Sequence, residues 1–458
     1  MLQIVDFFCK LNIAFPDLLS IASVFFLFIL TNFSKCDLKF ISKSSLLSAV
    51  VLLFSTLIFL SHSQYFVSEL FIYNSGIAQV KIILFCVLCL FLIFIHYSNI
   101  YKKLFPTFFV SVYGLVSAIN LSISSNSFLS LLLALELYTY SIAFLLEDRK
   151  CAVRFLLISA VMCASFLFGN SLLYLDSETL QFGKINYMHS VISIIGATLI
   201  VCSLLFKLGC VPFHSWLLDV YSHMSLVNIL FLEMIWKPFM VLIFFKTIST
   251  FSQFEFIYTV IEICAITSML VGSIMTIFQS NISKFVASIS ISHIGFVLTL
   301  IHIPSSFQYV MTYLAYYSVS IACFLYIFIS NNNFSRNIEF PELSGLCKYA
   351  SVQGFILILS LFATQGLPPF GNFFAKINLF RCLIIEHKWS QILFVTLFTI
   401  ISIIPIIKWL RVLFKQWNGT TIVRQNNLLH YILLLFLFGF SLFYIPTLQM
   451  FRKVFASL

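Results

Sequence analysis

Long apolar runs separated by short polar connections extend along the whole chain. A helix needs about 20 mostly apolar residues to cross the hydrocarbon core of a bilayer. Because nearly all connections are short, neighbouring helices should pack antiparallel in one bundle. The pattern predicts an all-α polytopic membrane protein with about 14 spans, centred on residues 18–33, 45–61, 76–97, 107–123, 126–146, 152–172, 188–211, 225–246, 256–278, 285–302, 308–330, 352–384, 389–407 and 428–447. The one long connection covers residues 331–351.

The composition excludes a soluble protein. Hydrophobic residues make up 61% of the chain and charged residues only 9%, whereas soluble domains carry about 25% charged residues. The 12 cysteines lie mostly within apolar runs, which favours ordinary buried thiols over a metal or cluster site. The excess of Phe, with 56 residues, is typical of AT-rich coding and favours an organelle-encoded protein.

The basic residues of the connections predict the orientation. The net charge is +10, and alternating connections place roughly twice as many Lys and Arg on one face as on the other. The positive-inside rule assigns the basic face to the cytoplasm or the mitochondrial matrix. We therefore expect a multi-pass protein of the mitochondrial inner membrane with both termini on the intermembrane-space side.

Ionisable residues inside the apolar runs are the main functional signal. A charge at the centre of a membrane helix costs about 2.5–3.5 kcal/mol on insertion scales, so each such residue is expected to have a structural or functional role that offsets this cost. The lysines, acids and histidine that fall within predicted spans are Lys81, Lys207, Lys237, Lys376, Glu136, Glu233, Glu262 and His293.

Helix breakers interrupt two of the predicted spans. The seventh contains Gly209 and Pro212 after Lys207, and the twelfth contains Gly366, Pro368 and Pro369 before Lys376. Such breaks free backbone groups that only protein or a wet cavity can satisfy, and paired discontinuous helices indicate a transport site. The seventh and twelfth spans are therefore predicted to be broken helices.

The same features are spaced as an internal repeat. Pro212 and Pro368 are 156 residues apart, and Glu136 and His293 are 157 apart. Five spans separate the members of each pair, and an odd offset makes the repeat inverted, with spans 4–8 matching spans 9–13. The predicted domains are helices 1–3, the first repeat, the second repeat and helix 14, over residues 1–105, 106–250, 251–415 and 416–458.

Buried lysines suit proton transfer. Burial disfavours the charged ammonium while a nearby carboxylate favours it, so a small movement of the carboxylate decides whether the proton stays. Arginine does not deprotonate, and none of the buried cations is Arg. A proton relay is predicted from the buried acid, lysines and histidine, namely Glu136, Lys207, Lys237, His293 and Lys376.

Structural roles compete with this hypothesis. Lys81 lies near the start of its span, where snorkelling to the interface is favoured. Glu233 and Lys237 are four residues apart on one helix and could form a static pair. Glu262 is either a partner for another helix or a lipid-edge residue, and His293 could be a hydrogen-bonded packing residue.

Cofactor motifs are missing from the sequence. It contains no GxGxxG motif, no Walker loop and no cysteine cluster, so we expect no nucleotide, metal or iron–sulfur centre on this chain. Any redox chemistry coupled to the chain should take place on other subunits.

Four stretches carry a family resemblance. They are Lys207-Leu-Gly-Cys-Val-Pro-Phe-His-Ser-Trp-Leu-Leu-Asp-Val-Tyr221, Leu135-Glu136-Leu-Tyr, Ser283 to Phe296 around His293, and Gly366-Leu-Pro-Pro-Phe-Gly-Asn-Phe-Phe-Ala-Lys376, with Glu342-Leu-Ser-Gly-Leu346 as a weaker match. Together they resemble the antiporter-like membrane-arm subunits of respiratory complex I. The ending Asp219-Val-Tyr221 favours the chain 2 branch of that family. The resemblance covers about residues 130–380.

The resemblance implies a fold, a function and partners. It implies a 14-helix subunit with inverted repeats, bound to neighbouring antiporter-like chains, in an NADH:ubiquinone oxidoreductase whose NADH, FMN, iron–sulfur and ubiquinone sites lie on other subunits. It implies proton translocation for the residues that match the family motifs, Glu136, Lys207, Lys237 and Lys376. The family often has proline before the eighth-helix lysine, whereas here Pro238 follows Lys237.

Two other functions remain open from the sequence. One is a subunit of a multi-subunit cation/proton antiporter with the same fold. The other is a purely structural subunit of the membrane arm, in which the buried charges only hold the bundle together.

Overall fold

The computed structural model describes residues 15–32, 37–61, 66–98, 100–184, 190–330, 339, 351–414 and 449. The chain forms two compact units. Unit 1 holds the described residues up to Leu204 together with Lys246–Gln253, and unit 2 holds Leu205–Phe245 and the described residues from Phe254 onward.

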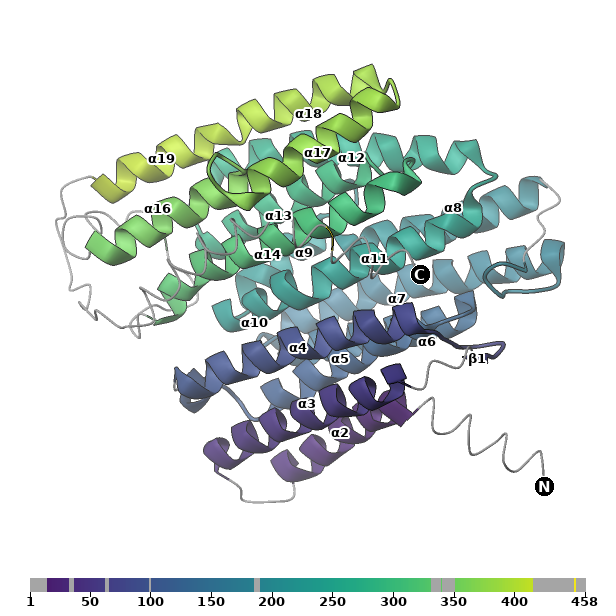
Figure 1. The fold of residues 1–458 in the computed structure, drawn as a ribbon, viewed down its shortest axis with the longest axis horizontal. Helices are drawn as coiled ribbons and strands as arrows, with labels where there is room; N and C mark the ends of the chain where they lie inside the picture. The colour runs from purple at the N-terminus through teal and green to yellow at the C-terminus, as the bar shows by residue number, and fades with distance from the viewer. Residues whose placement is uncertain are drawn as a thin grey trace. The chain divides into compact units, whose positions relative to one another are not determined.

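Unit 1 consists of helices that lie side by side, with one short hairpin between α3 and α4 (Figure 1). The α2 helix packs against α3 and α5, and α4 packs against α3 and α5. The elements are α2 (Phe15–Asn32), α3 (Leu38–Ser61), β1 (Phe66–Val67), β2 (Ile72–Tyr73), α4 (Ser75–Tyr97), η1 (Ile100–Lys103), α5 (Thr107–Ser124), α6 (Phe128–Leu145), α7 (Arg149–Ser177), most of α8 (Val191–Leu208), and η3 (Ser249–Phe251).

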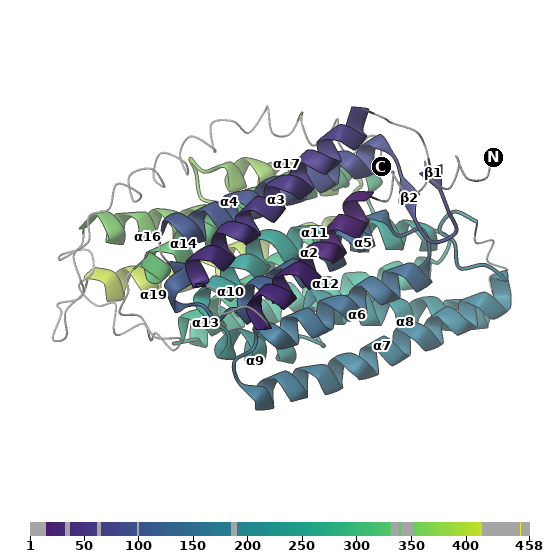
Figure 2. The same ribbon diagram turned by 90° about the horizontal axis from the view of Figure 1, so that it is seen from below.

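Unit 2 is also helical (Figure 2). Its α13 helix packs against α12 and α9, and every residue of α13 except Lys284 is buried. The α14 helix contacts both α16 and α17. The elements are α9 (Ser215–His223), α10 (Leu226–Phe231), η2 (Leu232–Trp236), most of α11 (Lys237–Ile248), α12 (Glu255–Phe278), α13 (Ile282–Leu298), η4 (Pro304–Ser306), α14 (Phe307–Ser330), α16 (Ser351–Gln365), α17 (Gly371–Ile385), α18 (Trp389–Ile401) and α19 (Ile403–Phe414).

The predicted all-α polytopic membrane fold class is confirmed, and every predicted run that falls on described residues contains a helix. Within the described part of the chain, 11 helices are long and apolar enough to cross a membrane. Shorter apolar helices, Ile282–Leu298 and Val352–Gln365, cover the tenth run and the first half of the twelfth. The fourteenth run at 428–447, the predicted domain 416–458 and most of the connection 331–351, with its Glu342 motif, lie outside the described residues.

Polar side chains define where several helices begin. The side chain of Asn74 accepts a hydrogen bond from the N–H of Ile77 at the start of α4. Ser127 and Ser130 form a capping box at the start of α6, and Asn281 accepts from the N–H of Ser283 at the start of α13. These caps satisfy N–H groups that a helix leaves without internal partners.

Small residues bring α12 and α13 into close contact. A Cβ atom added to Gly272 would lie 2.6 Å from the backbone nitrogen of Ser292, and one added to Gly295 would lie 2.6 Å from that of Met269. Membrane helices gain packing energy from such close backbone approach. The contact fixes the helix that carries His293.

Candidate functional site

Both predicted helix breaks are present, and they have the same geometry. The α8 helix ends at Leu208 and the α16 helix ends at Gln365, and each is followed by a glycine with positive φ, 76° at Gly209 and 72° at Gly366. At each break the glycine N–H bonds to the carbonyl three residues back and the next N–H to the carbonyl five residues back. This is the Schellman motif, in which glycine adopts the left-handed conformation without a Cβ penalty.

Side chains in unit 2 also donate hydrogen bonds to carbonyl groups in the last turns of the two broken helices. Trp216 Nε1 donates to the carbonyl of Phe206 at 2.8 Å. At the second break, Asn372 Nδ2 donates to Ala363 O at 3.0 Å, and Lys376 Nζ donates to Gln365 O at 2.5 Å. A cation near a helix C-terminus also interacts favourably with the helix dipole. The broken segments are therefore held in place by residues of the motifs themselves.

An ion pair within one helical segment forms the centre of unit 2. Lys237 Nζ lies 2.9 Å from Glu233 Oε1, and both side chains are buried. Between them the backbone forms a π turn, η2, in which the N–H of Lys237 bonds to the carbonyl of Leu232. Single π turns of this kind occur frequently at functional sites. The spacing had suggested the pair, but nothing in the pattern had suggested the π turn.

Hydroxyl groups from three helices surround the Glu233 carboxylate. Tyr221 on α9 donates to Oε1 at 2.7 Å, and Ser290 on α13 donates to Oε2 at 3.0 Å. Tyr317 on α14 donates to Oε2 at 3.3 Å. Hydrogen bonds of this kind stabilise the ionised carboxylate, so Glu233 has the environment of a buried anion. The sequence alone leaves the role of Glu233 open, and no pattern in it points to these three donors.

A series of contacts leads from the Glu233 carboxylate through Tyr317, His293 and Phe398 to Lys376. The ring of Tyr317 lies 4.6 Å from the imidazole of His293, measured between centroids, and His293 Nδ1 shares a hydrogen bond with the hydroxyl of Tyr313. The Phe398 ring is 5.7 Å from the imidazole and 5.3 Å from Lys376 Nζ. We call the set Lys237, Glu233, Tyr317, His293, Phe398 and Lys376 the unit 2 polar row.

The predicted relay residues are thus distributed unevenly. The structure brings Lys237, His293 and Lys376 into this row. Lys207 is also in unit 2, buried, with its Nζ 5.8 Å from the centroid of the Phe206 ring. Glu136 lies half-buried on α6 in unit 1. The relay through all five residues therefore stays a prediction.

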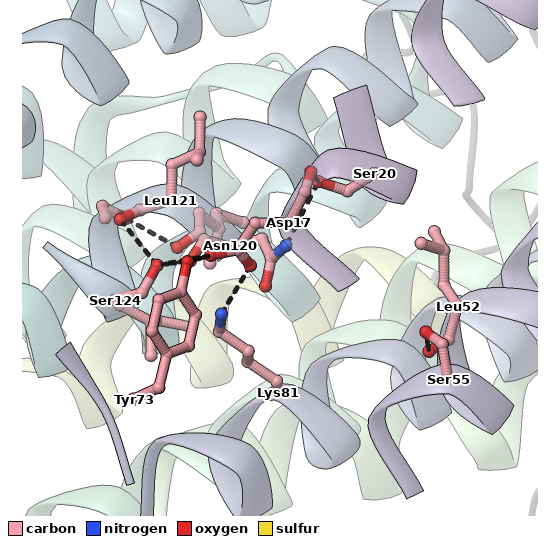
Figure 3. Close-up of polar contacts among 12 residues, drawn as sticks. Asp17, Ser20, Leu52, Ser55, Tyr73, Lys81, Asn120, Leu121 and Ser124 are labelled. Atoms are coloured by element: carbon pink, nitrogen blue, oxygen red, sulfur yellow. Dashed lines mark hydrogen bonds and ion pairs between the residues drawn. The ribbon is translucent and has the colours of Figure 1, made fainter. Parts of the chain in front are cut away.

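Lys81 does not snorkel, and that interpretation was wrong. Its side chain is 3% exposed, and Nζ lies 2.5 Å from Asp17 Oδ1 on α2. Asp17 Oδ2 accepts hydrogen bonds from Tyr73 at 2.5 Å and from Ser124 at 2.9 Å (Figure 3). We call Asp17, Tyr73, Lys81 and Ser124 the Asp17 cluster. The counter-ion lies 64 residues away, so no local spacing could have indicated it.

Glu262 is a partner for other segments of unit 2. Gln391 Nε2 donates to its Oε1 at 2.6 Å, His302 Nε2 lies 3.1 Å from the same oxygen, and Lys388 Nζ lies 3.8 Å from it. The carboxylate is about one-quarter exposed. This group belongs to neither the unit 2 polar row nor the Asp17 cluster.

Comparison with known proteins supports a common fold and family. Residues 125–404 match the model of the family described as NADH:quinone oxidoreductase/Mrp antiporter, TM. Over 371 residues the chain is 28% identical to NADH-quinone oxidoreductase subunit N of Rickettsia conorii, covering 77% of this chain and 81% of that protein.

Two solved structures share the fold. One chain of respiratory complex I from Thermus thermophilus superposes with a TM-score of 0.78 at 18% identity, covering 95% of this chain and 98% of that one. One chain of the membrane-bound sulfane sulfur reductase, an archaeal respiratory membrane complex, gives a TM-score of 0.82 at 13% identity, covering 97% and 96%. Because both identities are low, these likenesses establish the architecture alone.

Proposed function

Because the chain belongs to the NADH:quinone oxidoreductase/Mrp antiporter family of transmembrane proteins, we propose that it translocates protons as a membrane subunit of an NADH:quinone oxidoreductase. The related protein from Rickettsia conorii is named as subunit N of that enzyme. The redox chemistry and its cofactors are assigned to other subunits, and neighbouring membrane-arm chains are the expected partners. The composition supports a mitochondrial inner membrane location, with both termini in the intermembrane space.

The unit 2 polar row is the observation that carries this proposal. Lys237 and Glu233 form an ion pair, whereas each charge alone would be costly to bury within a bilayer. When Glu233 is ionised, Lys237 is stabilised as an ammonium; when the carboxylate is neutralised or moves away, the lysine proton is released. Tyr317 contacts both Glu233 and the imidazole of His293, so the next proton acceptor lies beside the pair.

Phe398 limits transfer beyond His293. Its ring contacts both the imidazole and the ammonium group of Lys376, and a phenyl ring neither donates nor accepts a proton. We propose that transfer from His293 to Lys376 uses a bridging water beside this ring. Glu136 and Lys207 complete the proposed relay through their match to the family motifs.

The test measures proton movement separately from electron transfer. The double variant Glu233→Gln/Lys237→Gln removes both charges, so no buried charge is left without a partner. Assembled enzyme carrying it is reconstituted in liposomes, and protons moved per NADH oxidised are measured. Glu262→Gln, which removes a half-buried carboxylate outside the row, is the matched control.

We expect the double variant to move fewer protons per electron and the control to match the unchanged protein. An unchanged ratio in the assembled double variant would instead support a purely structural subunit. If the native chain purifies in a complex without NADH dehydrogenase activity, the cation/proton antiporter function is supported and the oxidoreductase assignment fails.

A further inference from the structure

A second lysine lies beside the Asp17 cluster. Lys246 Nζ donates to the carbonyl of Ile123 at 2.8 Å and to the carbonyl of Ser125 at 2.7 Å. The residue between these carbonyls is Ser124, whose hydroxyl donates to Asp17. One turn of backbone at the end of α5 therefore contacts Lys246 on one side and the Asp17 carboxylate on the other.

Among the described residues, this site holds two lysines and one carboxylate. Asp17 is the one carboxylate that the described residues place in hydrogen-bonding distance of either lysine, and Lys81 forms the ion pair with it. Lys246 is held by two carbonyl oxygens and lies 5.8 Å from the centroid of the Phe182 ring. Lys246 therefore has carbonyl acceptors but no carboxylate within hydrogen-bonding distance among the described residues, and an ammonium group without a counter-ion in a low-dielectric region favours release of a proton.

The geometry identifies Lys246 as the group that releases it. An ammonium group has three N–H bonds and a neutral amine has two. The neutral form of Lys246 keeps one N–H for Ile123 and one for Ser125, so deprotonation breaks neither hydrogen bond. Lys81 cannot lose its proton as easily, because that would leave the Asp17 carboxylate without its counter-ion.

The remaining groups donate hydrogen bonds around Asp17 and offer a place for water. Burial raises the pKa of Tyr73, and the Asp17 carboxylate raises it further, so the hydroxyl stays protonated and only donates. Asn120 Nδ2 donates to Ser20 at 3.1 Å, while its Oδ1 is buried and accepts no hydrogen bond from a described residue (Figure 3). A buried amide oxygen of this kind typically binds an ordered water.

The site lies near one end of the helices of unit 1. Asp17 is in the first turn of α2, and Ser124 is the last residue of α5. Tyr73 comes two residues before α4, and Lys81 lies about 9 Å along that helix. The aqueous phase at that end is therefore the one with which such a site would exchange protons.

We propose that Asp17, Lys81 and Lys246 form a second proton-exchange site, with water as the carrier and Lys246 as the exchanging group. In the release step an N–H bond of the Lys246 ammonium breaks, its electron pair stays on nitrogen, and the proton forms an O–H bond with water. The resulting hydronium passes to the aqueous phase, and the reverse step reloads the amine. The inference rests on the proposed proton-translocating function and extends it to a site in unit 1.

The test uses substitutions that separate charge from proton exchange. Lys246→Arg keeps a cation and donors for both carbonyls, but arginine does not deprotonate. Lys246→Gln keeps two N–H donors and resembles the neutral amine. Lys184→Gln, at an exposed lysine of unit 1, is the control. Each variant is measured in the assembled enzyme in liposomes as protons moved per NADH oxidised.

Removing a proton-transfer group costs about 10²–10⁴-fold in the transfer step, so we expect proton exchange at this site to fall about 100-fold or more in both Lys246 variants. Assembled Lys246→Arg enzyme should therefore move fewer protons per electron. If it pumps normally, Lys246 only caps α5 and the inference is overturned. If Lys246→Arg does not assemble, normal pumping by Lys246→Gln overturns it equally.

The outcome for the unit 2 polar row distinguishes the two proposals. Normal pumping by Lys246 variants together with impaired pumping by the Glu233→Gln/Lys237→Gln enzyme contradicts only the second site. Normal pumping by both sets contradicts the proposed function itself.

Discussion

The described residues include two buried carboxylate–lysine pairs that are alike in chemistry and different in construction. Glu233 and Asp17 each accept hydrogen bonds from a tyrosine and a serine as well as contacting a lysine. The Glu233–Lys237 pair is contained in one helical segment, whereas Asp17 and Lys81 come from two helices. The first pair depends on the local backbone turn, and the second depends on how α2, α4 and α5 pack.

The largest effect should follow from removing one anion. Glu233→Ala leaves the Lys237 ammonium buried without its counter-ion, which typically destabilises a protein by about 3–5 kcal/mol. We expect little assembled protein. The neutral double variant Glu233→Gln/Lys237→Gln should recover most of it, measured as the amount of subunit in the purified complex. Equal losses in the single and double variants would contradict a dominant charge penalty.

Asp17→Asn should lower the free energy of unfolding by a smaller amount, about 2–3 kcal/mol. Lys81 loses its anion, but the amide oxygen can still accept a hydrogen bond from Tyr73 or Ser124. Since this pair joins separate helices, the variant should also loosen α2. Increased labelling of a cysteine placed at Ser20, compared with the same cysteine beside native Asp17, measures that loosening. No increase in labelling would show that the pair does not hold α2.

Gly366→Ala tests whether the helix break after α16 positions the unit 2 polar row. A non-glycine residue in the left-handed conformation costs about 1–2 kcal/mol, and the added Cβ would lie 3.1 Å from Cδ of Lys376. We expect a lower thermal unfolding temperature and altered pumping. Gly183→Ala, also at positive φ but with open space around it, should lower the unfolding temperature without changing pumping.

The smallest effects should come from single hydroxyl groups. Ser124→Ala and Ser290→Ala each remove one donor to a carboxylate that keeps others, so each should cost about 1 kcal/mol. Thermal unfolding of the two purified variants measures the difference directly. A much larger loss for Ser124→Ala would show that the carbonyl contacts of Lys246 depend on the same turn.

The comparison also explains what could be predicted from the sequence. Breaks at Gly209 and Gly366 follow from local backbone chemistry, so the residues alone located them correctly. The Glu233–Lys237 pair is visible as a four-residue spacing. Lys81 was misinterpreted because its partner Asp17 comes from a distant segment, and only tertiary packing brings the two together.

Other features depend on groups that have no distinctive pattern. The donors Tyr221, Ser290 and Tyr317 are ordinary hydroxyl residues in apolar helices, and their role appears only where three helices meet around Glu233. Lys246 lies at the end of a predicted span, where no pattern points to its contacts with the backbone carbonyls of Ile123 and Ser125. Neither arrangement follows from periodicity or residue type.

The π turn at Leu232–Trp236 determines in which direction the side chains of the following helix point around its axis. An α-helical turn contains 3.6 residues, and a π turn inserts one more. The extra residue rotates all the following residues of the helix by roughly 100° about the helix axis. Deleting a single residue from this turn would therefore change which way Lys237 and the following residues up to Phe245 point, relative to the residues of unit 2 that come before the turn. A π turn that shifted along the helix would rotate each residue that it passed by the same angle. A shift of this short stretch can therefore reorient individual side chains without moving the rest of the helix.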